Sequence, residues 1–286
     1  MSTDSEYETG AASARAVSVP ILMYHSVNEV PRSATRALSV HPAAFAQQLA
    51  YLRREGFTGI TFGDLCERRR EGVPLPSRPI VLTFDDGYAD FVEEALPVLC
   101  AWGFPATVFV TTGWLRGAGR DPLTAPPDRM LCWTQVAEAA AAGIEIGAHS
   151  DNHPELDQIS ERRLRAELGE PRRILEDRMG QTIRSLAYPY GYSNRHVREV
   201  CREVGYLQAA AVANRVSSDH VDAFRVPRLT VRRSTSMSAF ARTVRLKRVA
   251  VQYAPARTLT AGWAVARRTR SAVRQMRPTT SGSEGE

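Results

Sequence analysis

Two adjacent carboxylates and two histidines are the residues of this chain best suited to hydrolytic chemistry. Asp85 and Asp86 directly follow an apolar, β-branched run, and His149 and His153 follow another such run further along the chain. Neighbouring buried carboxylates raise each other's pKa unless a cation or hydrogen-bond donors compensate them. One carboxylate and two imidazoles form a common ligand set for a catalytic divalent metal, so Asp86, His149 and His153 are candidate ligands. Asp85 is then a neighbouring base that can take a proton from water.

Two other interpretations of these residues have to be weighed. The Asp-Asp-Gly87 sequence alone is equally typical of a solvated turn after a strand. The spacing of His149 and His153 also occurs in zincin helices, but Ser150 stands where that motif has Glu, and Pro154 disfavours a helical conformation at His153. We therefore expect a loop at a strand end, from which both histidines reach the carboxylate.

A hydrolase that cleaves an amide also needs a proton donor for its leaving group. His25 is a candidate, because it lies near the end of an early apolar segment, residues 17–27. The alternative interpretation is a core histidine that is hydrogen-bonded to backbone.

The segments that must position these residues alternate between strand-like and helix-like patterns. Apart from the segment that carries His25, strands are expected at residues 58–62, 79–84, 105–111, 144–148, 183–188, 207–212 and 224–231. Helical patterns lie between most of them, and Pro171 is expected to bend or break the helix that begins near Ser160. This alternation predicts an α/β barrel or a doubly wound sheet with its site at the carboxyl ends of the strands.

Three motifs together resemble the polysaccharide deacetylases with a NodB homology domain, carbohydrate esterase family 4. They are Thr83-Phe-Asp-Asp-Gly87, His149-Ser-Asp-Asn-His153 and Pro189-Tyr-Gly191, in this order. The resemblance covers about residues 19–231. It implies a distorted (β/α) barrel and metal-dependent removal of acetyl groups from N-acetylated sugars.

The resemblance also implies a role for each matching residue. Asp85 corresponds to the general base, and Asp86, His149 and His153 correspond to ligands of Zn2+ or of another divalent ion such as Co2+, Ni2+, Fe2+ or Mn2+. The backbone N–H of Tyr190 corresponds to a donor that stabilises the oxyanion.

The chain departs from the family pattern at its third motif. That motif usually begins with an Arg that orients the catalytic Asp, and here Ala187 stands at this position. Arg225 and Arg228, from a later strand, are candidates for the same role, and we assign it to Arg228. Replacing Arg228 with alanine should then lower turnover severely and leave the metal content unchanged.

The family's late motif with a catalytic histidine is also missing, since the last histidine, His220, lies in a polar loop. Instead, the N-terminal Met-Tyr-His-Ser-Val sequence around His25 resembles the branch that deacetylates poly-N-acetylglucosamine. In that branch the early histidine is the general acid, which assigns the same role to His25.

The sequence therefore predicts a metal-dependent N-deacetylase that acts on an N-acetylated sugar, a polysaccharide or a glycolipid precursor. The alternative enzyme hydrolyses a non-sugar amide or ester on the same metal site. A non-catalytic carbohydrate-binding protein is the alternative of another class. The complete set of Asp85, Asp86, His149 and His153 argues against it. The aromatic residues that could stack on a sugar are a separate question, and only Tyr190 is expected in the site. The others are expected in the core: Tyr24, Tyr88, Trp114 and Trp133.

Charge and composition indicate where the domain begins and ends within the chain. The 286 residues carry a formal net charge of +6, and the basic residues concentrate after residue 234. We expect a disordered segment at 1–16, a NodB-like domain at 17–234, and a basic, partly helical extension with a disordered end at 235–286. The four cysteines form no Cys-x-x-Cys pair, which predicts reduced thiols.

Location and partners follow from the two ends of the chain. The first residues lack the basic and apolar parts of a signal peptide, and no apolar run is long enough to span a bilayer, so a cytoplasmic protein is expected. The basic extension could lie on anionic lipid or dock on the domain, and no nucleic-acid partner is expected. Unchanged membrane sedimentation after deletion beyond Ser234 would exclude the lipid contact.

Overall fold

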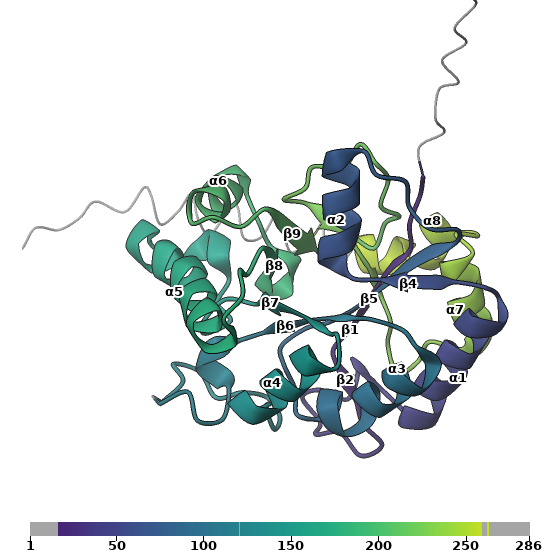
Figure 1. The fold of residues 1–286 in the computed structure, drawn as a ribbon, viewed down its shortest axis with the longest axis horizontal. Coiled ribbons are helices and arrows are strands. Elements are labelled where there is room, and N and C mark those ends of the chain that lie inside the picture. Colours follow the sequence, from purple (N-terminus) through teal and green to yellow (C-terminus); the bar gives the residue numbers. More distant parts are fainter. Residues whose placement is uncertain (1–16, 120, 259–261, 263–286) are drawn as a thin grey trace, which may run out of the picture.

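The computed structural model of the protein describes residues 17–119, 121–258 and 262, whose fold is shown in Figure 1. Helices surround a central sheet, in which all strand pairings are parallel. The predicted disordered N-terminus and the end of the basic extension lie outside these residues.

The sheet is built from short, almost entirely buried strands. In chain order its strands are β1 (Ile21–Tyr24), β4 (Thr58–Ile60), β5 (Pro79–Phe84), β6 (Thr107–Val110), β7 (Glu145–Ala148), β8 (Ser185–Ala187), β9 (Gln208–Ala211), β10 (Val226–Pro227) and β11 (Leu229–Thr230). Their spatial order is β10-β9-β8-β7-β6-β5-β1-β11, and β4 pairs with the first half of β5. Two further strands, β2 (Ser26–Val27) and β3 (Ser39–Val40), form a separate parallel pair.

The two ends of this sheet are joined by a single residue. The edge strands β10 and β11 are consecutive in the chain, and only Arg228 separates them. The sheet therefore curls round on itself into a nearly closed barrel, which confirms the predicted distorted (β/α) barrel. Closure also carries the Arg228 side chain into the interior, where it is fully buried.

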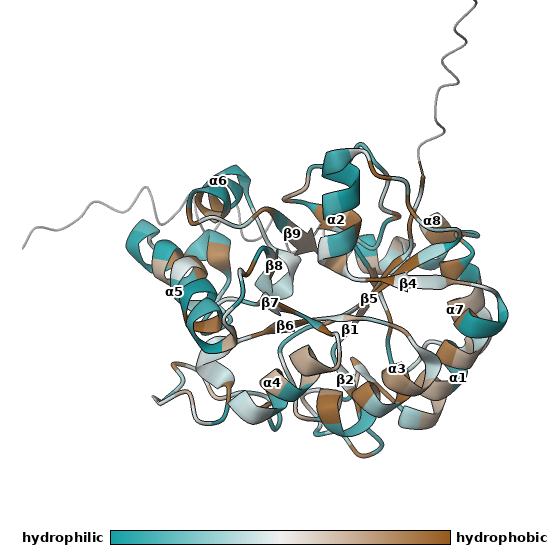
Figure 2. Ribbon diagram, in the orientation of Figure 1, coloured by the Kyte–Doolittle hydropathy of each residue, from teal (hydrophilic) through white to brown (hydrophobic). Residues whose placement is uncertain are grey.

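The helices cover the outside of the barrel. They are α1 (Pro42–Arg54), α2 (Phe62–Glu71), α3 (Leu96–Trp102), α4 (Trp133–Ala141), α5 (Glu161–Met179), α6 (Arg195–Glu203), α7 (Met237–Val244) and α8 (Val249–Gln252), with short turns η1 (Phe91–Ala95), η2 (Thr112–Trp114), η3 (Leu156–Gln158) and η4 (Pro189–Gly191). In α1, the His41 side chain caps the first turn by accepting a hydrogen bond from Ala43 N, while Phe45 and Leu49 are buried against the sheet side. The outward surfaces of α2, α5 and α6 are mainly hydrophilic (Figure 2).

The predicted break at Pro171 is wrong. Helix α5 continues through this residue for 19 residues in all. A proline removes one backbone hydrogen bond, to the carbonyl four residues earlier. Here Pro171 is buried, and Leu168 and Leu175 on the same helix pack into the core. We attribute the continuity of the helix to this packing.

The first part of the basic extension packs on the domain. Phe240 and Val244 of α7 and Val249 of α8 belong to the main core, and the Tyr253 hydroxyl donates a 3.0 Å hydrogen bond to the carbonyl of Thr230. The predicted membrane contact of the later residues lies outside the described part of the chain. No helix within the described part is both long and apolar enough to cross a membrane. All four cysteines are free.

Candidate metal centre and active site

The carboxyl ends of neighbouring strands bring the predicted site residues to one end of the barrel. His25 follows β1, Asp85 and Asp86 follow β5, and His149 follows β7. Tyr190 lies in η4, just beyond β8. Because parallel strands share their carboxyl edge, residues distant in sequence become neighbours there. Together these residues line one pocket of about 380 Å³.

Asp86, His149 and His153 form a compact group of potential metal ligands. Asp86 Oδ1 lies 3.2 Å from His149 Nε2 and 3.3 Å from His153 Nε2, and the three ligand atoms lie within 4.8 Å of one another. One carboxylate and two imidazoles that meet at one point suit a divalent ion and leave coordination positions open. The donor set and its geometry therefore fit the metal that the sequence predicts.

The backbone of β8 orients one of these histidines. His149 Nδ1 lies 2.8 Å from the carbonyl oxygen of Ala187. A proton on Nδ1 leaves Nε2 as the lone-pair donor that faces Asp86, which is the arrangement expected of a metal ligand. Ala187 thus contributes through its main chain at the position where the family pattern has an Arg side chain.

The backbone around the group is unusual. Four of the eight non-glycine residues with positive φ in the described chain are Asp86 (74°), Ser150 (61°), His153 (56°) and Tyr190 (58°). Side chains disfavour this conformation, and such residues cluster at functional sites, where the surroundings hold them. Gly87, with φ of 86°, completes the turn that follows the two carboxylates. The positive φ values explain how two short loops can present their side chains at one point.

Asp85 is held by Arg228 rather than by the metal group. Arg228 Nη1 and Nη2 donate hydrogen bonds of 2.6 and 2.7 Å to the two carboxylate oxygens of Asp85, and Nη1 also donates to Thr83 Oγ1. Both members of the ion pair are buried. Burial alone would raise the pKa of Asp85, but the charge and hydrogen bonds of Arg228, together with the nearby His149 and His25, outweigh burial and hold this pKa below its usual value. Asp85 is therefore an oriented anion, as a general base must be.

The structure distinguishes the two arginines that the sequence offered for this position. Arg225 is exposed, whereas Arg228 is fully buried at the seam of the barrel. Two residues separate them on a chain that is extended at β10, yet only Arg228 reaches Asp85.

His25 adjoins the same carboxylates. Residues Tyr24 and Phe84 are paired across β1 and β5, so His25 and Asp85 are the next residues on adjacent strands. His25 lines the pocket, while its Nδ1 is buried and has no hydrogen-bond partner among the described residues. Burial lowers the pKa of His25, an effect that the charges of Asp86 and Asp85 oppose.

Aromatic rings form a wall beside the ligand group. Trp114 stacks on His153 with ring centroids 4.9 Å apart. Tyr190 packs against His153 in a T-shaped arrangement, with ring centroids 4.6 Å apart. Tyr192 stacks in turn on Tyr190 at 5.5 Å. Tyr88 also lines the pocket. The Tyr190 side chain is about half exposed, as a platform for a sugar ring would be.

From the sequence, only Tyr190 was expected in the site, and Trp114 and Tyr88 were expected in the core. Both are indeed buried in a small core cluster, and both also line the pocket. Trp114 lies four residues beyond β6, and Tyr88 lies four residues beyond β5. Their position after the carboxyl ends of two central strands was the signal that could have placed both in the site.

Comparison with known proteins identifies the family. The profile described as polysaccharide deacetylase matches residues 72–209, which contain Asp85, Asp86, His149 and His153. This match and the relatives below support a relationship to the polysaccharide deacetylase family. This result confirms the resemblance drawn from the three sequence motifs.

The individual relatives are distant in sequence. A putative polysaccharide deacetylase, YxkH, from Bacillus subtilis (strain 168) is 25% identical over 222 residues, which are 78% of this chain and 74% of the relative. The poly-beta-1,6-N-acetyl-D-glucosamine N-deacetylase of Escherichia coli (strain K12) is 24% identical over 261 residues, 78% of this chain but only 38% of the relative. The structure of the Streptococcus pyogenes deacetylase PplD in complex with acetate has a TM-score of 0.72 and 24% identity, and covers 80% of this chain and 99% of that chain. This last similarity supports the fold.

Proposed function

We propose that this polysaccharide deacetylase is a divalent-metal-dependent hydrolase that removes N-acetyl groups from a β-linked N-acetylglucosamine polymer or a similar N-acetylated sugar. The observation that carries the proposal is the juxtaposition of an oriented base with a three-residue ligand group. Asp85 is locked by Arg228, and the next residue, Asp86, points at His149 and His153.

Each residue has a distinct task in this proposal. A divalent ion held by Asp86, His149 and His153 would supply Lewis-acid activation of water and of the acetamide carbonyl. The Asp85 carboxylate accepts the proton of the attacking water, and Arg228 keeps that carboxylate ionised and aimed. His25 donates a proton to the departing sugar nitrogen, and the Tyr190 N–H stabilises the developing oxyanion.

The substrate class is supported by the lining of the pocket and by the relatives. Trp114, Tyr190 and Tyr192 line the pocket with aromatic rings, and the half-exposed Tyr190 offers the kind of face on which a sugar ring stacks. The Escherichia coli relative is named for deacetylation of poly-beta-1,6-N-acetyl-D-glucosamine, although this chain covers only part of its length.

Acetate release tests the proposal. We expect the full-length protein to release acetate from poly-β-1,6-N-acetylglucosamine oligomers, to lose this activity after treatment with a chelator, and to regain it with one or more of Zn2+, Co2+, Ni2+, Fe2+ and Mn2+. Replacing Asp86 with alanine should lower both the bound metal, measured by elemental analysis, and the rate, because one of the three ligands is removed.

Two results would contradict the proposal in different ways. Undiminished acetate release by a metal-free protein would exclude the metal dependence. Hydrolysis of non-sugar acylamides with no action on any N-acetylated sugar would instead favour the alternative amide hydrolase on the same site.

A further inference from the structure

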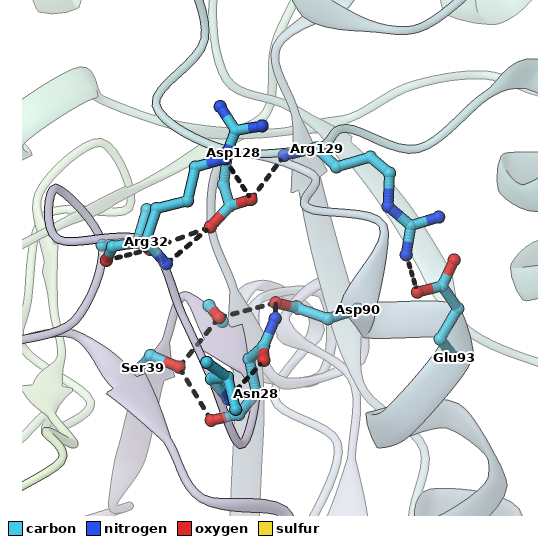
Figure 3. A network of polar contacts seen from close by, with 10 residues as sticks. Asn28, Arg32, Ser39, Asp90, Glu93, Asp128 and Arg129 are labelled. Atoms are coloured by element: carbon cyan, nitrogen blue, oxygen red, sulfur yellow. Dashed lines mark hydrogen bonds and ion pairs between the residues drawn. The ribbon is translucent and has the colours of Figure 1, made fainter.

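Asp90 is a buried carboxylate that the chemistry above does not use. It lies five residues after Asp85, at the start of η1, and is 7% exposed. Its oxygens accept hydrogen bonds from Ser26 Oγ (2.6 Å) and from the backbone N–H of Val27 (3.2 Å). Asn28 Nδ2 lies 3.5 Å away on the same side (Figure 3). All three partners belong to the segment that directly follows His25.

The position of Asp90 at a helical start would normally favour a different contact. An aspartate before a helix usually accepts a hydrogen bond from the backbone of its own first turn. Asp90 makes no such capping bond, and its side chain points across to β2 instead. Burial raises the pKa of Asp90 to about 6, so the charged form is held in the protein at a cost to stability. A carboxylate retained at such a cost is more typical of a functional residue than of packing.

The His25 ring lacks one of the usual anchors of a catalytic histidine. Its Nδ1 finds no hydrogen-bond partner in the described part of the chain, whereas catalytic histidines are commonly oriented by a hydrogen bond at this atom. The backbone on either side of His25 therefore gains importance for the orientation of its ring. On one side this is β1 in the sheet, and on the other it is β2, which is bound to Asp90.

We propose that Asp90 is a positioning residue that fixes β2 and thereby aims His25 at the leaving nitrogen of the substrate. This role rests on the proposed deacetylase function. The hydrogen bonds to Ser26 and Val27 hold the two residues next to His25, and Ser26 Oγ also contacts Ser39 Oγ at 3.0 Å, which ties β2 to β3.

The same network contains a second carboxylate that serves as a matched control. Asp128 accepts hydrogen bonds from the backbone N–H of Arg32 (3.3 Å) and from Thr35 Oγ1 (3.1 Å), and so holds the loop between β2 and β3 at a point further from His25 (Figure 3). A general loosening of this loop would follow from loss of either Asp90 or Asp128. Misalignment of His25 is expected from loss of Asp90 alone.

Leaving-group dependence separates positioning of the acid from general damage. Replacing Asp90 with alanine is expected to lower kcat for the N-acetylated sugar by about 10²-fold with little change in KM, because small misplacements of a catalytic group have effects of this size. The same variant should hydrolyse 4-nitrophenyl acetate at close to the wild-type rate, since that leaving group departs without a proton. Asp90→Asn, which keeps the shape and one acceptor oxygen, should recover part of the lost kcat. Asp128→Asn should leave kcat near wild type.

A double variant tests whether Asp90 acts through His25. If it does, His25→Asn combined with Asp90→Ala should be no slower than His25→Asn alone, because the aim of an absent imidazole no longer matters. The inference would be overturned if the rate losses of the two single variants multiplied in the double variant. It would also be overturned if Asp90→Ala slowed hydrolysis of the amide and of the aryl ester equally.

Hydrogen exchange gives a readout that does not depend on turnover. The Val27 amide should exchange faster in Asp90→Ala than in the wild type or in Asp128→Asn, since its acceptor has been removed. Unchanged protection of Val27 would contradict the proposed anchor. If the wild-type protein releases no acetate with any of the divalent ions, the proposed function fails and this role of Asp90 fails with it. A fully active Asp90→Ala variant would remove the Asp90 inference alone.

Discussion

Replacing Arg228 with methionine is expected to reduce kcat for deacetylation by about 10²- to 10⁴-fold, the range contributed by a general base, while the bound metal stays unchanged. Arg228 donates two hydrogen bonds to Asp85, and its other hydrogen bonds go to Thr83 Oγ1 and to the Ala211 carbonyl rather than to the three proposed ligands. Without the guanidinium, burial dominates and the pKa of Asp85 rises. Because Asp85 must be ionised to accept a proton, the acidic limb of the pH–rate profile should move to higher pH.

Stability should fall in the same variant. Removing one member of a buried ion pair leaves an uncompensated charge and costs about 3–5 kcal/mol. Wild-type Asp85 has a depressed pKa, so its pairing stabilises the protein above the unfolded pKa and is lost as the pH falls through the folded pKa. In Arg228→Met this stabilisation is absent, and the difference in unfolding free energy between the two proteins should be largest at neutral pH.

Matched variants separate charge from packing. Asp85→Asn combined with Arg228→Met removes both charges, and is expected to recover much of the stability but none of the turnover. The exposed Arg225 provides the surface control, since Arg225→Met should change neither quantity. Wild-type turnover in Arg228→Met with metal bound would show that Asp85 needs no orienting cation.

Replacing His25 with asparagine is expected to lower kcat for the N-acetylated sugar by about 10²- to 10⁴-fold and to abolish the basic limb of the pH–rate profile. A general acid must carry its proton, so activity that depends on His25 falls as the pH rises through its pKa. Burial lowers the pKa of His25, and kcat/KM, which reports the free enzyme, should therefore decline earlier than for an exposed histidine. Asparagine cannot titrate, so this decline should vanish.

Two comparisons test this role of His25. The aryl acetate, whose leaving group needs no proton, should be hydrolysed by His25→Asn almost as fast as by the wild type. His41, which caps α1, provides a control, because His41→Asn should retain the wild-type profile. A His25→Asn profile that keeps the wild-type basic limb would assign the proton donor to another group.

Local sequence patterns were sufficient to predict the main strands and the group of potential metal ligands. The apolar runs before Asp85 and before His149 predict buried parallel strands, and strands of that kind must deliver the residues that follow them to one edge. Pro154 excluded a helix for the second histidine motif, and the structure places His153 in a loop with positive φ. The class of fold and the convergence of Asp86 with the two histidines therefore followed from patterns that span only a few residues each.

Closure of the barrel decided what the sequence left open. Arg225 and Arg228 are equivalent in composition and nearly equivalent in position, and their roles differ because Arg228 alone joins β10 to β11 at the seam, 143 residues from Asp85 in the chain. Similarly, Asp90 and Ser26 meet across 64 residues, and Trp114 meets His153 through loop conformation. Such contacts depend on how distant segments pack, which local propensity and hydrophobic period do not encode. The sequence by itself determined the chemistry available to this protein, and the tertiary structure decided which charges support Asp85 and His25.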